Sequence, residues 1–147
     1  DIFSIHIKDL RYHIFFGFAD KILSLFSLGP EYNTYQGGLR MNEISTYQFF
    51  LLYQTKNNIK LIDVRESYEY DQYHIDGSQN IPLQLLLDKH HLFVNSLNHY
   101  YLICHNGAKS RIAAIFLANQ GISATSIVGG ISRWPGRLVK TAKYKSY

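Results

Sequence analysis

The single cysteine of the chain, Cys104, stands where a strand is expected to end and a helix to begin. The continuous apolar run over residues 100–104 predicts a strand that is covered on both faces. In open parallel sheets, ligands bind at the carboxyl ends of the strands. A tight loop that leads into a helix directs successive backbone N–H groups inward and can hold an anion. A cysteine in such a loop is favoured as the thiolate, so we predict that Cys104 is a nucleophile.

The loop over residues 104–110 contains the remaining candidate site residues. Gly107 is expected where the loop closes sharply, since a residue free to adopt a positive φ angle is needed there. Ser110 is expected to cap the N-terminus of the following helix. Lys109 either lends positive charge to the rim of the loop or is an exposed, solvated side chain. His105 and Asn106 are expected at the mouth, where a surface position without a role is the favoured interpretation for His105. The candidate substrate-binding residues are His105, Asn106, Gly107, Ala108, Lys109 and Ser110.

A lone cysteine also excludes several kinds of site. It rules out an internal disulfide, a cysteine-rich zinc site and a resolving cysteine within the chain. Without its neighbours, a lone cysteine is most simply a small buried hydrophobic residue. No metal is expected, because the adjacent His90 and His91 diverge on a helix and no acidic or cysteine cluster joins them. No cofactor is expected either.

Length and composition indicate a globular protein. The 147 residues fit one domain with an appendage, and an apolar fraction of 46% is sufficient for a real core. No apolar run is long enough to predict a membrane span. The N-terminus lacks the basic start, apolar core and small-residue cleavage site of a secretory signal. We therefore expect a cytoplasmic protein.

The regular pattern of elements begins at Met41. Short apolar runs predict strands, and longer amphipathic or capped segments predict helices. The expected strands are 60–64, 80–81, 100–104 and 124–128. The expected helices are 44–52, with Asn42 or Ser45 near its start, and 67–73, 83–94 and 110–120, with a final helix that holds Trp134 after a turn at Gly129-Gly130. Alternating strands and helices predict a mostly parallel sheet with helices on both faces.

Residues 1–40 form a separate extension of unknown role. Their apolar spacing over residues 12–28 predicts an amphipathic helix that ends at Gly29-Pro30, and Gly37-Gly38 is typical of a linker. Three interpretations stay open. Met41 is the natural start and the extension is non-native, or a helix packs on the domain or a partner, or a helix lies on a membrane surface. The acidic Asp20 and the scarcity of basic residues argue against the last.

The formal charge of +4 is concentrated towards the C-terminus. Five basic residues without an acid make up a basic tail: Arg133, Arg137, Lys140, Lys143 and Lys145. A solvated basic helix end is the favoured interpretation, since cations suit helix C-termini. An anionic partner is the alternative, and sulfur delivery to tRNA would be one form of it. A nucleic acid partner is otherwise not expected.

Three ordered blocks carry a resemblance to a known family. Residues 104–110 resemble the active-site loop of rhodanese domains, Cys-x-x-Gly-x-Arg-Ser. A second block runs through 61–66, 69–70 and 74–82, and a third consists of Gly129-Gly130-Ile131 with Trp134. The order and spacing are those of the family, over about residues 42–136. The chain is thus similar to a single-domain sulfurtransferase of the rhodanese-like family, with a domain at 41–147 that includes the basic tail.

This resemblance implies a fold and a mechanism. The fold is α/β, with a central, mostly parallel sheet of about five strands flanked by helices on both faces. The implied enzyme takes sulfane sulfur from thiosulfate or a persulfide and holds it as a persulfide on Cys104. It then transfers the sulfur to a thiol, to cyanide or to a cysteine of a partner protein. Asp63 and Arg65 are implied as structural support for the loop, not as catalytic residues.

One departure from the family pattern concerns the sulfur donor. Lys109 stands where the family loop has arginine. Lysine keeps the charge but lacks the planar, two-pronged donor geometry of arginine. Recognition of the doubly charged thiosulfate is therefore expected to be weaker than that of a persulfide.

Two alternative functions remain open. The first is a non-catalytic binding or regulatory module, a role that rhodanese-like domains also take, usually after losing the cysteine. The second is a cysteine phosphatase or arsenate reductase, whose loop has the pattern Cys-x5-Arg. In this chain Ser110 occupies the position of that arginine and Arg111 comes one residue later, which argues against phosphate chemistry.

Overall fold

The computed structural model describes residues 34–36 and 39–141, which belong to one compact unit of the chain, Tyr32–Tyr147. The helix expected over 12–28, its end at Gly29-Pro30, the Gly37-Gly38 linker and the last two lysines of the basic tail lie outside the described residues. No helix within the described ranges is long and apolar enough to cross a membrane.

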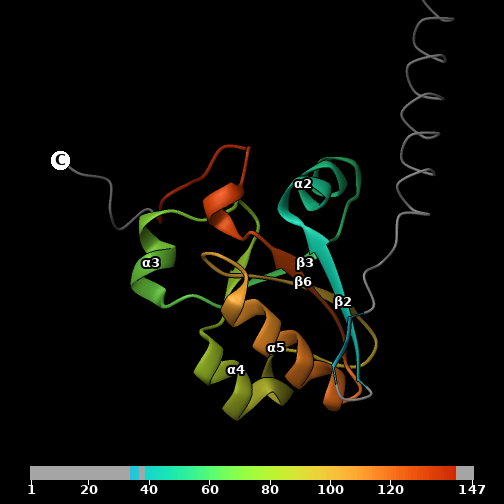
Figure 1. The fold of residues 1–147 in the computed structure, drawn as a ribbon. Coiled ribbons are helices and arrows are strands. Elements are labelled where there is room, and N and C mark those ends of the chain that lie inside the picture. The colour runs from blue at the N-terminus through green and yellow to red at the C-terminus, as the bar shows by residue number, and fades with distance from the viewer. Residues whose placement is uncertain (1–33, 37–38, 142–147) are drawn as a thin grey trace, which may run out of the picture. The chain divides into compact units, whose positions relative to one another are not determined.

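The described residues form a sheet of six strands flanked by helices (Figure 1). The strands lie in the order β1-β2-β6-β5-β3-β4. Their bounds are β1 Thr34–Gln36, β2 Leu39–Ser45, β3 Lys60–Asp63, β4 Gln79–Asn80, β5 His99–Ile103 and β6 Ser123–Val128. All neighbours from β2 to β4 are parallel, and β1 adds an antiparallel edge to β2. The predicted sheet of about five mostly parallel strands is confirmed, with one further edge strand.

Strand β2 was not expected from the sequence. It pairs residues 42–45 with residues 125–128 of β6, so Ile44 lies in a strand and not in the predicted helix 44–52. Helix α2 begins two residues later than predicted and spans Thr46–Thr55. Ser45 caps it, because its hydroxyl accepts from the N–H of Gln48 and its own N–H donates to the Gln48 side chain. Without the partner strand, this mixed polar and apolar segment carries no clear strand pattern.

The other helices lie close to their predicted positions. They are α3 Ser67–Gln72, α4 Leu83–Lys89 and α5 Ala108–Asn119, with short 3-10 turns η1 His90–Leu92 and η2 Ile131–Arg133. The helix expected over 83–94 is therefore split into α4 and η1. The final helix is a single 3-10 turn, and Trp134 follows it. In Figure 1, α4 and α5 lie below the sheet and α2 lies above it.

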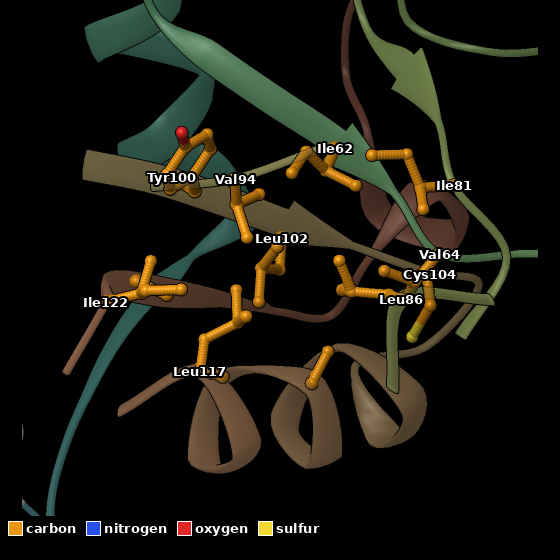
Figure 2. Packing of buried hydrophobic residues seen from close by; sticks show 13 residues of the cluster. Ile62, Val64, Ile81, Leu86, Val94, Tyr100, Leu102, Cys104, Leu117 and Ile122 are labelled. Atoms are coloured by element: carbon orange, nitrogen blue, oxygen red, sulfur yellow. The ribbon is translucent and has the colours of Figure 1, made fainter. Parts of the chain in front are cut away.

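Two buried clusters cover the two faces of the sheet. Leu102 of β5 belongs to the cluster beneath α4 and α5, and the next residue, Ile103, belongs to the cluster against Phe49 of α2. Both side chains are fully buried, which explains the continuous apolar run of this strand. Figure 2 shows the first cluster, with Tyr100 at one end and Cys104 at the other. The core therefore fixes the strand that ends at the cysteine.

The C-terminal segment does not continue as a helix. Val139 forms an isolated antiparallel bridge with His74, with reciprocal N–H to carbonyl bonds of 2.9 and 2.8 Å. The N–H of Thr141 donates to the carbonyl of Asp71. The interpretation of the tail as a basic helix end is thus wrong for Arg137 and Lys140, whereas Arg133 does end the 3-10 turn η2. The segment is held against the end of α3 by backbone bonds.

Candidate active site

Cys104 follows β5 at the edge of the sheet where the parallel strands end, and α5 begins four residues later. Its Sγ accepts two backbone hydrogen bonds, from the N–H of Gly107 at 3.1 Å and from the N–H of Ser110 at 3.4 Å. The side chain is 1% exposed. Figure 2 shows it beside Val64 and Leu86 of the buried cluster. The backbone N–H dipoles of Gly107 and Ser110 are therefore directed at this sulfur.

Gly107 makes the tight loop possible. It adopts a φ angle of +105°, as predicted, in the region that favours glycine. A Cβ atom at this position would meet the backbone N of Gly129 at 3.3 Å. Gly107 is also the N-cap residue of α5, so the prediction that Ser110 caps this helix is wrong. The loop closes so sharply that the helix starts at Ala108, and Ser110 already lies within its first turn.

Ser110 instead serves the interior of the site. Its side chain is fully buried, and its hydroxyl donates to the carbonyl of Gly107 at 3.1 Å. The thiol of Cys104 donates to the same hydroxyl at 3.7 Å. The hydroxyl of Ser126, in β6, lies 2.9 Å from that of Ser110. Ser126 was not among the predicted site residues, although a polar residue in a buried strand is a signal that could have identified it.

The turn at Gly129-Gly130 holds the other side of the loop. The N–H of Ile131 donates to the carbonyl of Cys104 at 2.9 Å, and the N–H of Ser132 donates to the carbonyl of His105 at 3.0 Å. Gly130 lies so close that a Cβ atom would collide with both of these carbonyl oxygens. Because two successive carbonyls of the loop are bound by η2, the orientation of the loop backbone is fixed.

Asp63 and Arg65 form a buried ion pair at the end of β3. Their side chains are almost fully buried, and Nη2 of Arg65 lies 2.7 Å from Oδ2 of Asp63. The same nitrogen donates to the carbonyl of Tyr73, which ties β3 to the end of α3. The link to β5 runs through Val64, whose N–H donates to the carbonyl of Ile103 at 2.9 Å. The two members of the pair flank Val64, whose bond to Ile103 lies one residue before Cys104. The role of the pair as support for the loop stays a prediction.

The remaining loop residues lie at the rim. His105 and Asn106 are exposed, and Asn106 Oδ1 accepts from the N–H of Ala108 at 3.1 Å. Lys109 is half-exposed and forms an ion pair with Glu66, with Nζ and Oε1 3.4 Å apart. The structure therefore places Gly107 and Ser110 against the Cys104 sulfur, whereas His105, Asn106 and Ala108 are exposed at the rim. It also adds Glu66, which the sequence analysis quoted only as part of a motif.

A hollow among the described residues lies away from Cys104. It has a volume of about 380 Å³ and is lined by residues at the opposite ends of β3 and β5, including Lys60, Asn98 and Tyr100. Cys104 does not line it. In the described part of the chain, no three His, Cys, Asp or Glu side chains come together as metal ligands. Among the described residues, the Cys104 loop is therefore the candidate active site that the geometry supports best.

Comparison with known proteins identifies the family of the chain. Residues 49–136, more than half of the chain, match the family model described as "Rhodanese-like domain". The chain belongs to the rhodanese-like family. The matched residues include the Cys104 loop, the Asp63–Arg65 pair and the Gly129-Gly130 turn, so the whole arrangement described above lies within the rhodanese-like domain.

Relatives with assigned names are similar over part of their length. YrkF of Bacillus subtilis, whose name marks it as a candidate sulfur carrier protein, is 33% identical over 96 residues, 65% of this chain and 51% of YrkF. The thiosulfate sulfurtransferase GlpE of Stutzerimonas stutzeri is 32% identical over 76 residues, 50% of this chain and 68% of GlpE. The chain spans 63% of YqhL, another Bacillus subtilis relative.

Solved structures agree with the fold. A rhodanese-like domain protein from Staphylococcus aureus superimposes with a TM-score of 0.64 at 25% identity, covering 69% of this chain and 100% of that one. The parallel sheet and its helices are therefore those of rhodanese-like domains.

Proposed function

We propose that this rhodanese-like domain is a sulfurtransferase that carries sulfane sulfur as a persulfide on Cys104. The observation that carries the proposal is the pair of backbone N–H groups, of Gly107 and Ser110, that donate to the cysteine sulfur. Fixed dipoles aimed at an anionic sulfur favour the thiolate that attacks and the persulfide anion that results. A cysteine that served only packing would not need two amide donors on its sulfur.

The proposed reaction has two steps. In the first, the Cys104 thiolate attacks the sulfane sulfur of the donor, and a new S–S bond forms. With thiosulfate, the bond between the two donor sulfurs breaks and sulfite leaves with the electron pair. With a persulfide donor, a thiolate leaves in the same way. In the second step, a cyanide ion or a thiolate attacks the outer sulfur, and Cys104 returns as thiolate with thiocyanate or a new persulfide as product.

Two further observations support this proposal. The similar proteins YrkF and GlpE are named as a candidate sulfur carrier and as a thiosulfate sulfurtransferase. The 147 residues contain no second cysteine that could resolve a persulfide on Cys104, which favours transfer of the sulfur to an external acceptor. We therefore propose small thiols, cyanide or a cysteine of a partner protein as acceptors.

Intact-mass measurement tests the proposal directly. The reduced protein is incubated with thiosulfate and, separately, with a low-molecular-weight persulfide. We expect a gain of one sulfur atom, about 32 Da, that cyanide removes and that Cys104→Ser does not show, as required of a covalent intermediate. Circular dichroism confirms that the variant is folded. No gain from either donor in folded, reduced protein would refute sulfur transfer and favour a binding module.

A further inference from the structure

Lys109 in the Cys104 loop and Arg111 directly after it are each paired with a carboxylate. Lys109 is the only basic side chain of the loop other than His105, and Glu66 lies beside its ammonium group. Arg111, in the first turns of α5, lies 3.7 Å from Glu43 of β2. A site that binds a small dianion usually presents unpaired positive charge at its mouth. Here the positive charge of Lys109, within the loop itself, is offset by Glu66.

The backbone of Glu66 is fixed at this position. It follows Arg65, which is buried, and its own N–H donates to Oε2 of Glu69 at 3.1 Å. Both side chains of the pair with Lys109 are partly accessible, with 47% of Glu66 and 44% of Lys109 exposed. The pair itself therefore adds little to stability. The Glu66 carboxylate nevertheless places one negative charge beside the Cys104 loop, which is the loop that would receive the sulfur donor.

We propose that Glu66 determines donor selectivity. By offsetting Lys109, it disfavours dianionic thiosulfate and leaves persulfides of small thiols, with one negative charge or none, as the preferred sulfur donors. This inference rests on the proposed sulfurtransferase function, since it concerns the step in which Cys104 accepts sulfur. Glu66 is a specificity residue in this proposal, and takes no part in bond making.

The size of the effect follows from Coulomb's law. For a dianion about 7 Å from the carboxylate in a solvent-like dielectric, removing the negative charge is expected to raise the sulfur-uptake rate about five-fold at low ionic strength. The interaction energy is proportional to the donor charge, so the rate for a monoanionic persulfide should rise by only about two-fold. At about 0.5 M salt the gain for thiosulfate should fall below roughly two-fold, because the Debye length is then shorter than the separation.

The test compares Glu66→Gln with a charge-matched control. Asp88→Asn removes the same charge from an exposed residue of α4, whose carboxylate accepts from Gln84. Initial rates of sulfur uptake on Cys104 are measured by intact mass with thiosulfate and with 2-hydroxyethyl persulfide, at low and high salt. We expect wild-type protein to take sulfur faster from the persulfide. Glu66→Gln should raise the thiosulfate rate about five-fold at low salt, while Asp88→Asn changes it by less than about two-fold.

The outcomes separate the two proposals. Suppose that wild-type protein takes up sulfur. The selectivity role of Glu66 would then be overturned if Glu66→Gln gained equally with both donors, left the thiosulfate rate unchanged, or kept its gain at high salt. Sulfur transfer itself would stand in each of these cases. If Glu66→Gln lowered the uptake rate with both donors, Glu66 would have a purely structural role, and its selectivity role would also be overturned. No uptake by the folded wild-type protein from either donor would overturn sulfur transfer itself, and the selectivity role with it.

Discussion

Replacing Gly130 with alanine should displace the backbone of the Cys104 loop while leaving the cysteine itself unchanged. Gly130 has a φ angle of +57° and a ψ angle of −158°, a region that is essentially limited to glycine. An added Cβ would collide with the carbonyl oxygens of Cys104 and His105. Neither of these backbone atoms can move aside as the end of a flexible side chain could. The loop must therefore shift, and the hydrogen bonds from Ile131 and Ser132 must lengthen or break.

The expected cost has two parts. A non-glycine residue in such a sparsely populated backbone region costs about 1–3 kcal/mol, and each strained backbone hydrogen bond loses up to about 1 kcal/mol. We therefore expect Gly130→Ala to lower the free energy of unfolding by about 2–4 kcal/mol. The N–H groups that face the sulfur should be displaced at the same time. A loss of even one such interaction corresponds to about a ten-fold or larger decrease in the rate of sulfur uptake.

Gly121→Ala is the matched control for backbone strain. Gly121 has a φ angle of +73°, and an added Cβ there would meet nothing within 4 Å. This variant should lose only about 1–2 kcal/mol and keep its sulfur uptake. Stability is measured by urea unfolding, and uptake by intact mass under conditions where each variant is folded. If the two variants lose equal stability and Gly130→Ala takes up sulfur at the wild-type rate, then the turn does not position the loop.

Three further predictions concern groups around the site. Ser110→Ala removes the partner of the buried Ser126 hydroxyl while keeping the backbone N–H that faces the sulfur. Urea unfolding should show a loss of about 1–3 kcal/mol, and sulfur uptake should be retained; abolished uptake in folded protein would contradict this. Arg65→Met leaves the carboxylate of Asp63 buried without its ion pair, so unfolding should show a loss of about 3–5 kcal/mol; a loss below about 1 kcal/mol would contradict the buried pair. Burial raises the pKa of Tyr53 above its ordinary value of 10.0, with Asp76 and Tyr70 adding to the shift. The folded state thus favours the protonated phenol, and the stability linked to it is complete below pH 10.0 and lost as the pH rises through the raised pKa. As the pH is raised above 10.0, the free energy of unfolding should fall less for Tyr53→Phe than for wild-type protein. Identical dependence of the two unfolding free energies on alkaline pH would refute the raised pKa.

The sequence alone determined the fold class and the family. The continuous apolar run that ends at Cys104 and the glycine at Gly107 are local features, because a buried strand and a sharp loop restrict the residue types that fit them. The predicted parallel sheet and the positive φ angle of Gly107 are confirmed. The role of Cys104 as a nucleophile stays a prediction, for which the two amide donors provide the geometric support.

Only the tertiary structure decided how the site is held together. Strand β2 has no clear pattern of its own and exists through its pairing with β6. Likewise, Ser110 forms its polar contacts inside the site because the loop closes tightly enough to start the helix at Ala108. The contacts of Glu66 with Lys109 and of the Gly130 turn with the loop join residues far apart along the chain. Local sequence patterns indicate which backbone conformations a segment can adopt. Contacts between distant segments depend instead on packing, because those segments meet only when the whole sheet has formed.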